Sequence, residues 1–153
     1  MIQARDAESL YDLDIEPDLN RFMGRIFENM CCEYIAMLNS RKDSRIPQYA
    51  PLPFKIRQIG RWWGANPKTK SEEEIDIMGV NEKLSSVVFC ECKYRNEPTD
   101  IQVLNTLVNK AERWNYDHKY FIIFSKSGFT KGLKNAAKKA GNVQLIILKE
   151  MYA

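Results

Sequence analysis

Histidine is almost absent from this 153-residue sequence, which holds a single copy at His118. Catalysis by Ser-His-Asp or Cys-His groups is therefore excluded unless that one residue serves it. His118 lies in NYDHKY, just before an apolar run, and we expect it in a loop. The sequence also lacks a GxxxxGKS or GxxxxGKT segment, so this chain carries no P-loop for ATP.

Cysteine is infrequent, and its spacing differs from that of metal sites and disulfide frameworks. The four copies occur as Cys31-Cys32 and Cys90-x-Cys92, which match neither CxxC zinc pairs nor a secreted disulfide pattern. We expect buried free thiols, because free cysteine behaves as a small apolar core residue. A metal site made of all four would require a helix and a strand to converge.

Long apolar runs are also missing, since none approaches the roughly 18 residues of a membrane span. The N-terminus is acidic and lacks the basic start and apolar centre of a secretory signal. With 44% hydrophobic and 28% charged residues, the composition is typical of a soluble globular domain. We therefore expect a cytoplasmic protein with no membrane partner. The net charge of +3 permits a nucleic-acid partner without indicating one.

Three segments carry helical signals. Apolar residues recur at helical spacing from Leu19 to Leu38, which predicts an amphipathic helix of about six turns with Asp18 as its N-cap. A capping-box pattern at Thr99 and Gln102 predicts the start of a second helix. A lysine-rich third helix is expected to follow the KSGFT turn and to end near Gly141, a C-cap.

Five segments carry strand signals, three of them in succession before the second helix. The order helix, three strands, helix, strand, helix, strand predicts a mixed sheet flanked by helices. Residues 1–17 are expected to be an N-terminal extension or linker remnant, and residues 18–153 one domain. The predicted strands lie within 54–64, 73–80, 86–94, 119–125 and 143–148.

Charged residues interrupt two of the predicted strands, where unpaired charges are normally excluded. In the segment EEIDIMGV, strict alternation places Glu74, Asp76 and Met78 on one face and Ile75 and Ile77 on the other. The question is what keeps the carboxylate of Asp76 in a strand interior.

The next strand offers an answer, because Glu91 and Lys93 share a face there. If the two strands pair as a hairpin, Asp76 can lie beside both residues. Two converging carboxylates favour a cation between them, and their oxygens favour Mg²⁺ or Mn²⁺. Lys93 could then orient or deprotonate a water, or neutralise charge on phosphorus. The alternative is a salt-bridged cluster at the sheet edge.

Asp76 followed by Glu91-Cys92-Lys93 resembles the bipartite D…(D/E)xK signature of the restriction-endonuclease-like superfamily, the PD-(D/E)XK phosphodiesterases. The predicted element order resembles the core of that superfamily. The resemblance implies a restriction-endonuclease-like three-layer fold, with a central mixed β-sheet flanked by helices, and a Mg²⁺- or Mn²⁺-dependent hydrolase acting as a DNA endonuclease. It also implies that Glu28, on the first helix, supports the site. The alternative for Glu28 is an ordinary solvated side chain.

A resemblance over nearly the whole chain beyond residue 18 is carried by segments such as MGRIFENMCCEYI, IGRWWG and IIFSKSGFTKGL. These segments are similar to the uncharacterised C-terminal, nuclease-like domain of an archaeal and bacterial ATPase family. The resemblance implies a prokaryotic source and an ATPase module in the parent chain or assembly. A homodimer is plausible for cutting two strands. The alternative function is a non-catalytic module that couples the ATPase to nucleic acid or protein, with the charged cluster as a polar network.

Five residues are candidates for contacts with nucleic acid. Members of the superfamily often use a residue on the helix after the ExK strand, and spacing does not choose between Gln102 and Lys110. Arg61 could contact phosphate and Trp63 could stack on a base, although adjacent tryptophans more often cap a core. Ser125 begins SKSGFT, which resembles a phosphate-cradling turn at a helix N-terminus, or is a plain turn.

Overall fold

The computed structural model describes residues 16–41 and 52–152 of the chain. Its elements follow the predicted order of one helix, three strands and two further helix–strand units, which is therefore confirmed. The helices and strands are α2 (Glu16–Arg41), β1 (Gln58–Ala65), β2 (Glu72–Asn81), β3 (Ser86–Lys93), α3 (Ile101–Ala111), β4 (His118–Ser125), α4 (Lys131–Ala140) and β5 (Val143–Ile147), with short 3-10 turns η2 (Glu82–Leu84) and η3 (Leu148–Tyr152).

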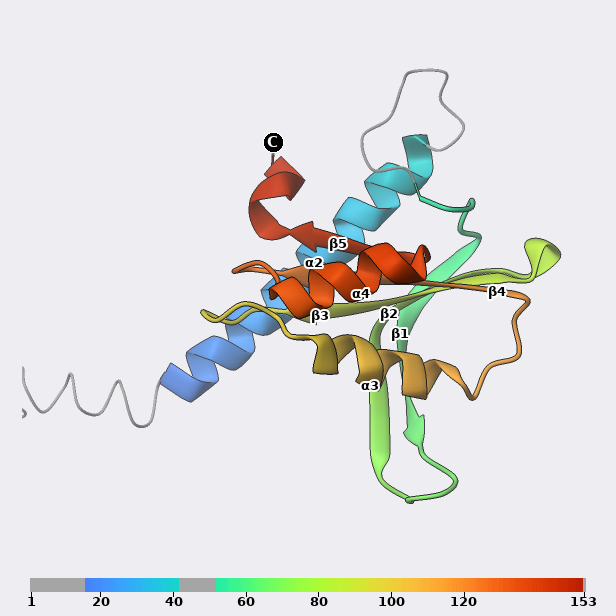
Figure 1. Ribbon diagram of the computed structural model, residues 1–153, viewed down its shortest axis with the longest axis horizontal. Helices are drawn as coiled ribbons and strands as arrows, with labels where there is room; N and C mark the ends of the chain where they lie inside the picture. The colour runs from blue at the N-terminus through green and yellow to red at the C-terminus, as the bar shows by residue number, and fades with distance from the viewer. Residues whose placement is uncertain (1–15, 42–51, 153) are drawn as a thin grey trace, which may run out of the picture.

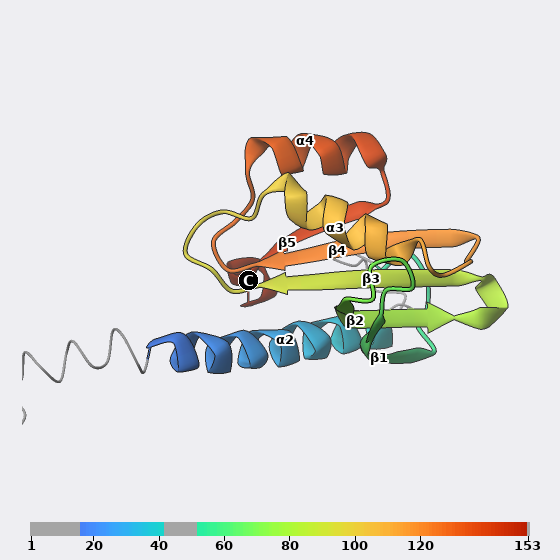
Figure 2. The same ribbon diagram turned by 90° about the horizontal axis from the view of Figure 1, so that it is seen from below.

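The five strands form one mixed sheet in the order β1-β2-β3-β4-β5. The first three strands pair antiparallel, and β3, β4 and β5 pair parallel. Helix α2 covers one face of the sheet, whereas α3 and α4 cover the other (Figure 2). The predicted mixed sheet between layers of helices is therefore confirmed. Among the described residues, no helix is long and apolar enough to cross a membrane.

The sheet separates two apolar cores, one beneath α2 and one beneath α3 and α4. Strand β3 contributes to both cores because its side chains alternate faces: Val88 and Cys90 pack with α2, whereas Phe89 packs with α3. All four cysteines are free, and three of them are buried, as predicted. The alternation predicted for β3 therefore holds along its length.

The helix starts differ from the predicted ones. Helix α2 already begins at Glu16, because proline at 17 is tolerated in a first helical turn. Asp18 therefore lies inside the helix, and its prediction as the N-cap is wrong. His118 is the first residue of β4 rather than a loop residue. Gly141 does end α4, with a left-handed φ of 81° that suits glycine.

The N-cap of α3 is Asp100 rather than Thr99. The Asp100 side chain accepts a hydrogen bond from the Ile101 backbone N–H. The Thr99 hydroxyl is used elsewhere, since it donates to Ser125 Oγ at 2.9 Å. A tertiary contact thus displaces the predicted capping box by one residue, and Gln102 remains exposed.

Strand β2 contains a β-bulge. Between two successive pairs of the β1–β2 ladder, β1 moves by two residues, from position 60 to 62, whereas β2 moves by three, from position 78 to 75. The extra residue is therefore in β2. Arg61 therefore stands opposite both Asp76 and Ile77. As a result Ile75 and Ile77 pack into the cores on opposite faces of the sheet. The strict alternation predicted across this stretch is wrong, because the extra residue reverses the pattern.

Beyond the bulge, β2 leaves β3. The two strands pair only from Ile77 to Asn81, and the rest of β2 pairs with β1 alone. The segment 61–76, which we call the arm, therefore projects from the sheet as a two-stranded hairpin (Figure 1). The candidate site lies where the arm departs.

Candidate functional site

Asp76 lies in the bulge and turns its carboxylate toward β3. It is 8% exposed, and its Oδ2 accepts a hydrogen bond of 2.9 Å from the backbone N–H of Cys92. That amide has lost its place in the β2–β3 ladder because the strands have separated. Bulges commonly redirect a side chain in this way. The carboxylate of Asp76 thus binds the residue that stands between Glu91 and Lys93.

Glu91 and Lys93 share a face of β3, as their spacing predicts, and both line a cleft beside α3. Lys93 Nζ lies 3.3 Å from Glu91 Oε1, and the Glu91 side chain is 12% exposed. Burial raises the pKa of Glu91 to about 7, and the negative charge of Asp76 adds to this. Lys93 and Lys110 oppose the rise. The two carboxylates are therefore close enough to repel each other.

Glu28 lies on α2, which covers the face of the sheet opposite to α3 (Figure 2). Burial raises the pKa of its carboxyl, and the charge of Asp76 raises it further. The guanidinium groups of Arg61 and Arg25 act in the opposite direction. Glu28 therefore lies within electrostatic reach of Asp76 and Glu74 rather than on an isolated, fully solvated helix face.

The donor set fits a divalent cation held by two carboxylates. Asp76 and Glu91 supply oxygen ligands, which Mg²⁺ and Mn²⁺ prefer, and such ions retain several waters. Within residues 16–41 and 52–152, no group of three or more His, Cys, Asp or Glu side chains is close enough to share an ion. Glu28 therefore does not form a three-carboxylate group with Asp76 and Glu91.

A cleft of about 370 Å³ opens beside Glu91 and Lys93, between β3 and α3. Both predicted helix candidates, Gln102 and Lys110, line it. Lys110 is tied into the site more firmly, because its Nζ donates to the backbone carbonyl of Glu74 at 2.8 Å and its charge lowers the pKa of Glu91. Gln102 is exposed along the same wall.

The remaining candidates differ in what they present to solvent. Arg61 forms an ion pair of 3.1 Å with Glu74, both side chains being about half exposed, and Trp63 is 65% exposed. Ser125, in contrast, is 1% exposed. Its hydroxyl donates to the Gly128 carbonyl at 2.8 Å. The structure therefore places Ser125 in the framework of its turn rather than at a surface open to phosphate.

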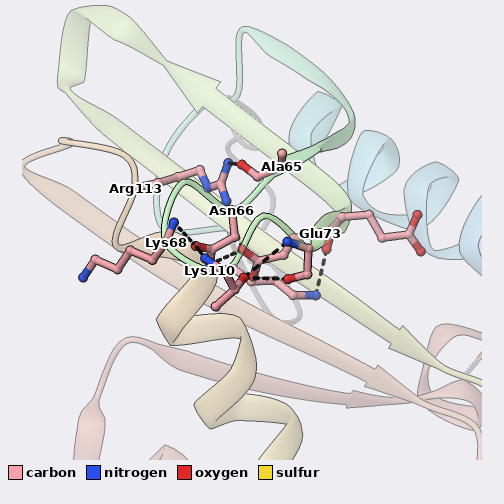
Figure 3. A network of polar contacts seen from close by, with 9 residues as sticks. Ala65, Asn66, Lys68, Glu73, Lys110 and Arg113 are labelled. Atoms are coloured by element: carbon pink, nitrogen blue, oxygen red, sulfur yellow. Dashed lines mark hydrogen bonds and ion pairs between the residues drawn. The ribbon is translucent and has the colours of Figure 1, made fainter.

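Arg113 is a residue that the sequence analysis missed. Its guanidinium lies 4.4 Å from the ring of Trp62. It donates to the Ala65 carbonyl at 3.2 Å and to Glu73 Oε1 at 3.0 Å (Figure 3). Arg113 thus fastens the arm to the end of α3. The only local signal is its spacing of three residues from Lys110, which places both on one side of the helix end.

Replacing Arg113 with methionine is expected to lower the free energy of unfolding by about 1 to 3 kcal/mol, because a stacked cation and two hydrogen bonds are lost. Urea denaturation measures the change. Lys134→Met, on the exposed face of α4, is the matched control and should stay within about 0.5 kcal/mol. Equal stability of the two variants would contradict the bracing role.

Comparisons with known proteins give a family and a distant structural likeness. Residues 1–112 match the model of a family described as archaea bacterial proteins of unknown function. A relative from Methanocaldococcus jannaschii, the uncharacterized protein MJECL04, is 29% identical over 124 residues, which cover 78% of this chain and 25% of the relative. The chain thus spans about a quarter of that relative. A solved structure, the DNA modification-dependent restriction endonuclease AspBHI, is 12% identical with a TM-score of 0.39, over 86% of this chain and 33% of that one.

Proposed function

The chain belongs to the DUF234 family of archaeal and bacterial proteins of unknown function, and from its own residues we propose that it is a restriction-endonuclease-like, metal-dependent phosphodiesterase domain that hydrolyses DNA. One observation carries this proposal. The carboxylate of Asp76 is hydrogen-bonded to the backbone N–H of Cys92, which places it against the residue between Glu91 and Lys93.

This arrangement joins the two halves of the D…ExK signature although 15 positions separate Asp76 from Glu91 in the sequence. A polar network kept only for stability would pair each buried carboxylate with a cation or with hydrogen-bond donors. Here Glu91 has Lys93 at 3.3 Å, yet burial and Asp76 still hold its pKa at about 7. Lys93 therefore does not fully offset burial and the repulsion from Asp76, and a cation bound by both carboxylates would offset them further.

Asp76 and Glu91 would hold Mg²⁺ or Mn²⁺. When bound, such an ion polarises a phosphodiester and lowers the pKa of its water. Lys93, whose side chain is 24% exposed at the cleft, would orient the attacking water or offset the charge that develops on phosphorus. Lys110 and Gln102 line the same wall and would contact neighbouring phosphates.

The test is a cleavage assay with supercoiled plasmid and circular single-stranded DNA in Mn²⁺ or Mg²⁺. The wild-type domain should nick or cut the DNA, EDTA should stop the reaction, and Asp76→Asn should reduce it to background. This substitution keeps the size of the side chain while removing its charge. Equal background cleavage by wild type and Asp76→Asn would overturn the proposal.

A second candidate is a non-catalytic module that couples an ATPase to nucleic acid or to a protein. It is favoured by the length of the relative, of which this chain spans only a quarter, so further modules are expected beside it. The resemblance of the sequence to ATPase C-terminal domains supports an ATPase as that module. This candidate predicts nucleic-acid or partner binding that Asp76→Asn leaves intact, without metal-dependent cleavage by the wild type.

A further inference from the structure

Trp63 is unusually exposed for a tryptophan, with 65% of its surface open to solvent. Its neighbour Trp62 turns to the opposite face of the arm, where it packs edge-on to Trp114 at 4.7 Å. Trp63 pairs across the strands with Glu74, and directly opposed residues share a face. Trp63 therefore lies on the α2 side of the arm, together with Glu74.

The arm that carries Trp63 is held in place by contacts from α3, from Arg113 just after it and from the hairpin turn. Arg113 binds the Ala65 carbonyl and Glu73, and Asn66 Nδ2 donates to Glu73 at 2.7 Å (Figure 3). Lys110 adds a bond to the Glu74 carbonyl. None of these contacts uses the ring of Trp63. An exposed aromatic ring is thus held on a braced strand.

Arg61 lies on the same face of the arm as Trp63 and forms an ion pair of 3.1 Å with Glu74, while Arg61, Arg25 and Asp76 all act electrostatically on Glu28. Arg61 stands two residues from Trp63, roughly 7 Å along the strand, and lies opposite Asp76 in the bulge. Arg25 acts on Glu28 electrostatically, and Arg21 precedes it by one helical turn, so the two share a helix face. All three arginines are exposed. Exposed guanidinium groups beside a flat aromatic ring match the phosphates and bases of nucleic acid.

We propose that Trp63 is a stacking platform for an unpaired base, so that the domain acts on nucleic acid with a single-stranded segment. Stacking on a tryptophan face requires a base that is not stacked within a duplex. Arg61 and Arg25 hold the adjoining phosphates and lead the strand from Trp63 to Asp76. The placement beside a scissile phosphate rests on the proposed function, whereas the stacking itself does not.

Equilibrium binding in EDTA tests the platform without cleavage. The probe is a fluorescein-labelled oligothymidylate of about 20 nucleotides, beside an abasic strand of equal length and a duplex. Trp63→Ala should bind the oligothymidylate about 5- to 100-fold more weakly, and Trp63→Phe should fall between it and wild type. Wild type should lose affinity for the abasic strand and the duplex, whereas Trp63→Ala should bind the abasic strand and the oligothymidylate alike.

Tyr152→Ala is the matched control, because Tyr152 is 70% exposed and follows β5 at the opposite edge of the sheet. Its affinity should equal that of wild type. Unchanged affinity of Trp63→Ala for the oligothymidylate overturns the platform. If that variant instead changes from dimer to monomer in size-exclusion chromatography, the face is a protein contact, which also overturns it.

The result separates the platform from the nuclease. Trp63-dependent binding without cleavage by wild type supports the platform and overturns the proposed hydrolysis. Metal-dependent cleavage together with binding that does not depend on Trp63 supports the proposed hydrolysis and overturns the platform.

Discussion

Lys93→Met is expected to lower the rate of metal-dependent DNA cleavage by at least about 100-fold, the size typical of removing a general acid–base or charge-stabilising group. Lys93 Nζ lies 3.3 Å from Glu91, and the side chain is 24% exposed at the mouth of the cleft. Methionine retains the apolar stem of lysine and removes only the charged head. The loss should therefore appear in kcat, while the fold is unchanged.

The assay must separate catalysis from metal binding. Lys93 lowers the pKa of Glu91, so its removal raises that pKa further and weakens metal binding near neutrality. At about pH 8.5, above the wild-type pKa of about 7, the difference in Glu91 ionisation between the two proteins is smaller than at neutrality. Titration calorimetry there should give Mn²⁺ affinities within a few-fold of each other, with cleavage still lost.

Lys126→Met is the control for this experiment. Lys126 follows β4 next to the end of β3, where its Nζ donates to Asn96 Oδ1 at 2.9 Å and lies 4.5 Å from the Tyr94 ring. Like Lys93, it is a partly exposed lysine held by contacts of its ammonium group, but these contacts are to Asn96 and Tyr94 and not to Asp76 or Glu91. Cleavage by Lys126→Met should stay within about two-fold of wild type. Full activity of Lys93→Met, or an equal loss in both variants, would remove Lys93 from the mechanism.

The order of elements and the face of β3 could be predicted from sequence because both depend on local periodicity. Side chains alternate faces along β3, so Glu91 and Lys93 lie on the same face as Phe89, which packs in the core beneath α3. The position of Asp76 could not be predicted in this way. Its bulge interrupts a segment that reads as regularly alternating, and nothing in that segment marks the extra residue.

The bracing of the arm depends on contacts between distant residues. Lys110 reaches Glu74 across 36 positions, and Arg113 reaches Ala65 across 48. Such contacts arise from the packing of α3 against the sheet rather than from a pattern within either segment. Sequence reasoning therefore identified Lys110 as a candidate but could not separate it from Gln102. The hydrogen bond to Glu74 and the effect on Glu91 now favour Lys110.

Glu91 gives the second large prediction, a dependence of stability on pH in the metal-free domain. Its pKa in the folded protein is about 7, above the ordinary 4.5. The folded state thus binds this proton more tightly than the unfolded state does. The resulting stabilisation is fully present below about pH 4.5 and is lost as the pH rises through about 7.

Glu91→Gln mimics the protonated side chain and should remove this dependence. In EDTA, urea denaturation should show the variant about 1 to 3 kcal/mol more stable than wild type at pH 8 and close to it at pH 5. Glu97→Gln, an exposed residue of the same cleft, should follow the wild-type profile. If the free energy of unfolding of wild type and of Glu91→Gln changes with pH in the same way, burial and Asp76 do not raise the pKa of Glu91.

Adding Mn²⁺ at pH 8 should reverse the ranking. An ion that binds only the folded state stabilises it by RT ln(1 + L/Kd), where L is the free ion concentration, and it relieves the repulsion between Asp76 and Glu91. Wild type should therefore gain stability with increasing Mn²⁺, whereas Glu91→Gln, having lost one charged ligand, should gain much less. If both proteins gain equally, the ion binds elsewhere, and the two carboxylates do not form its site.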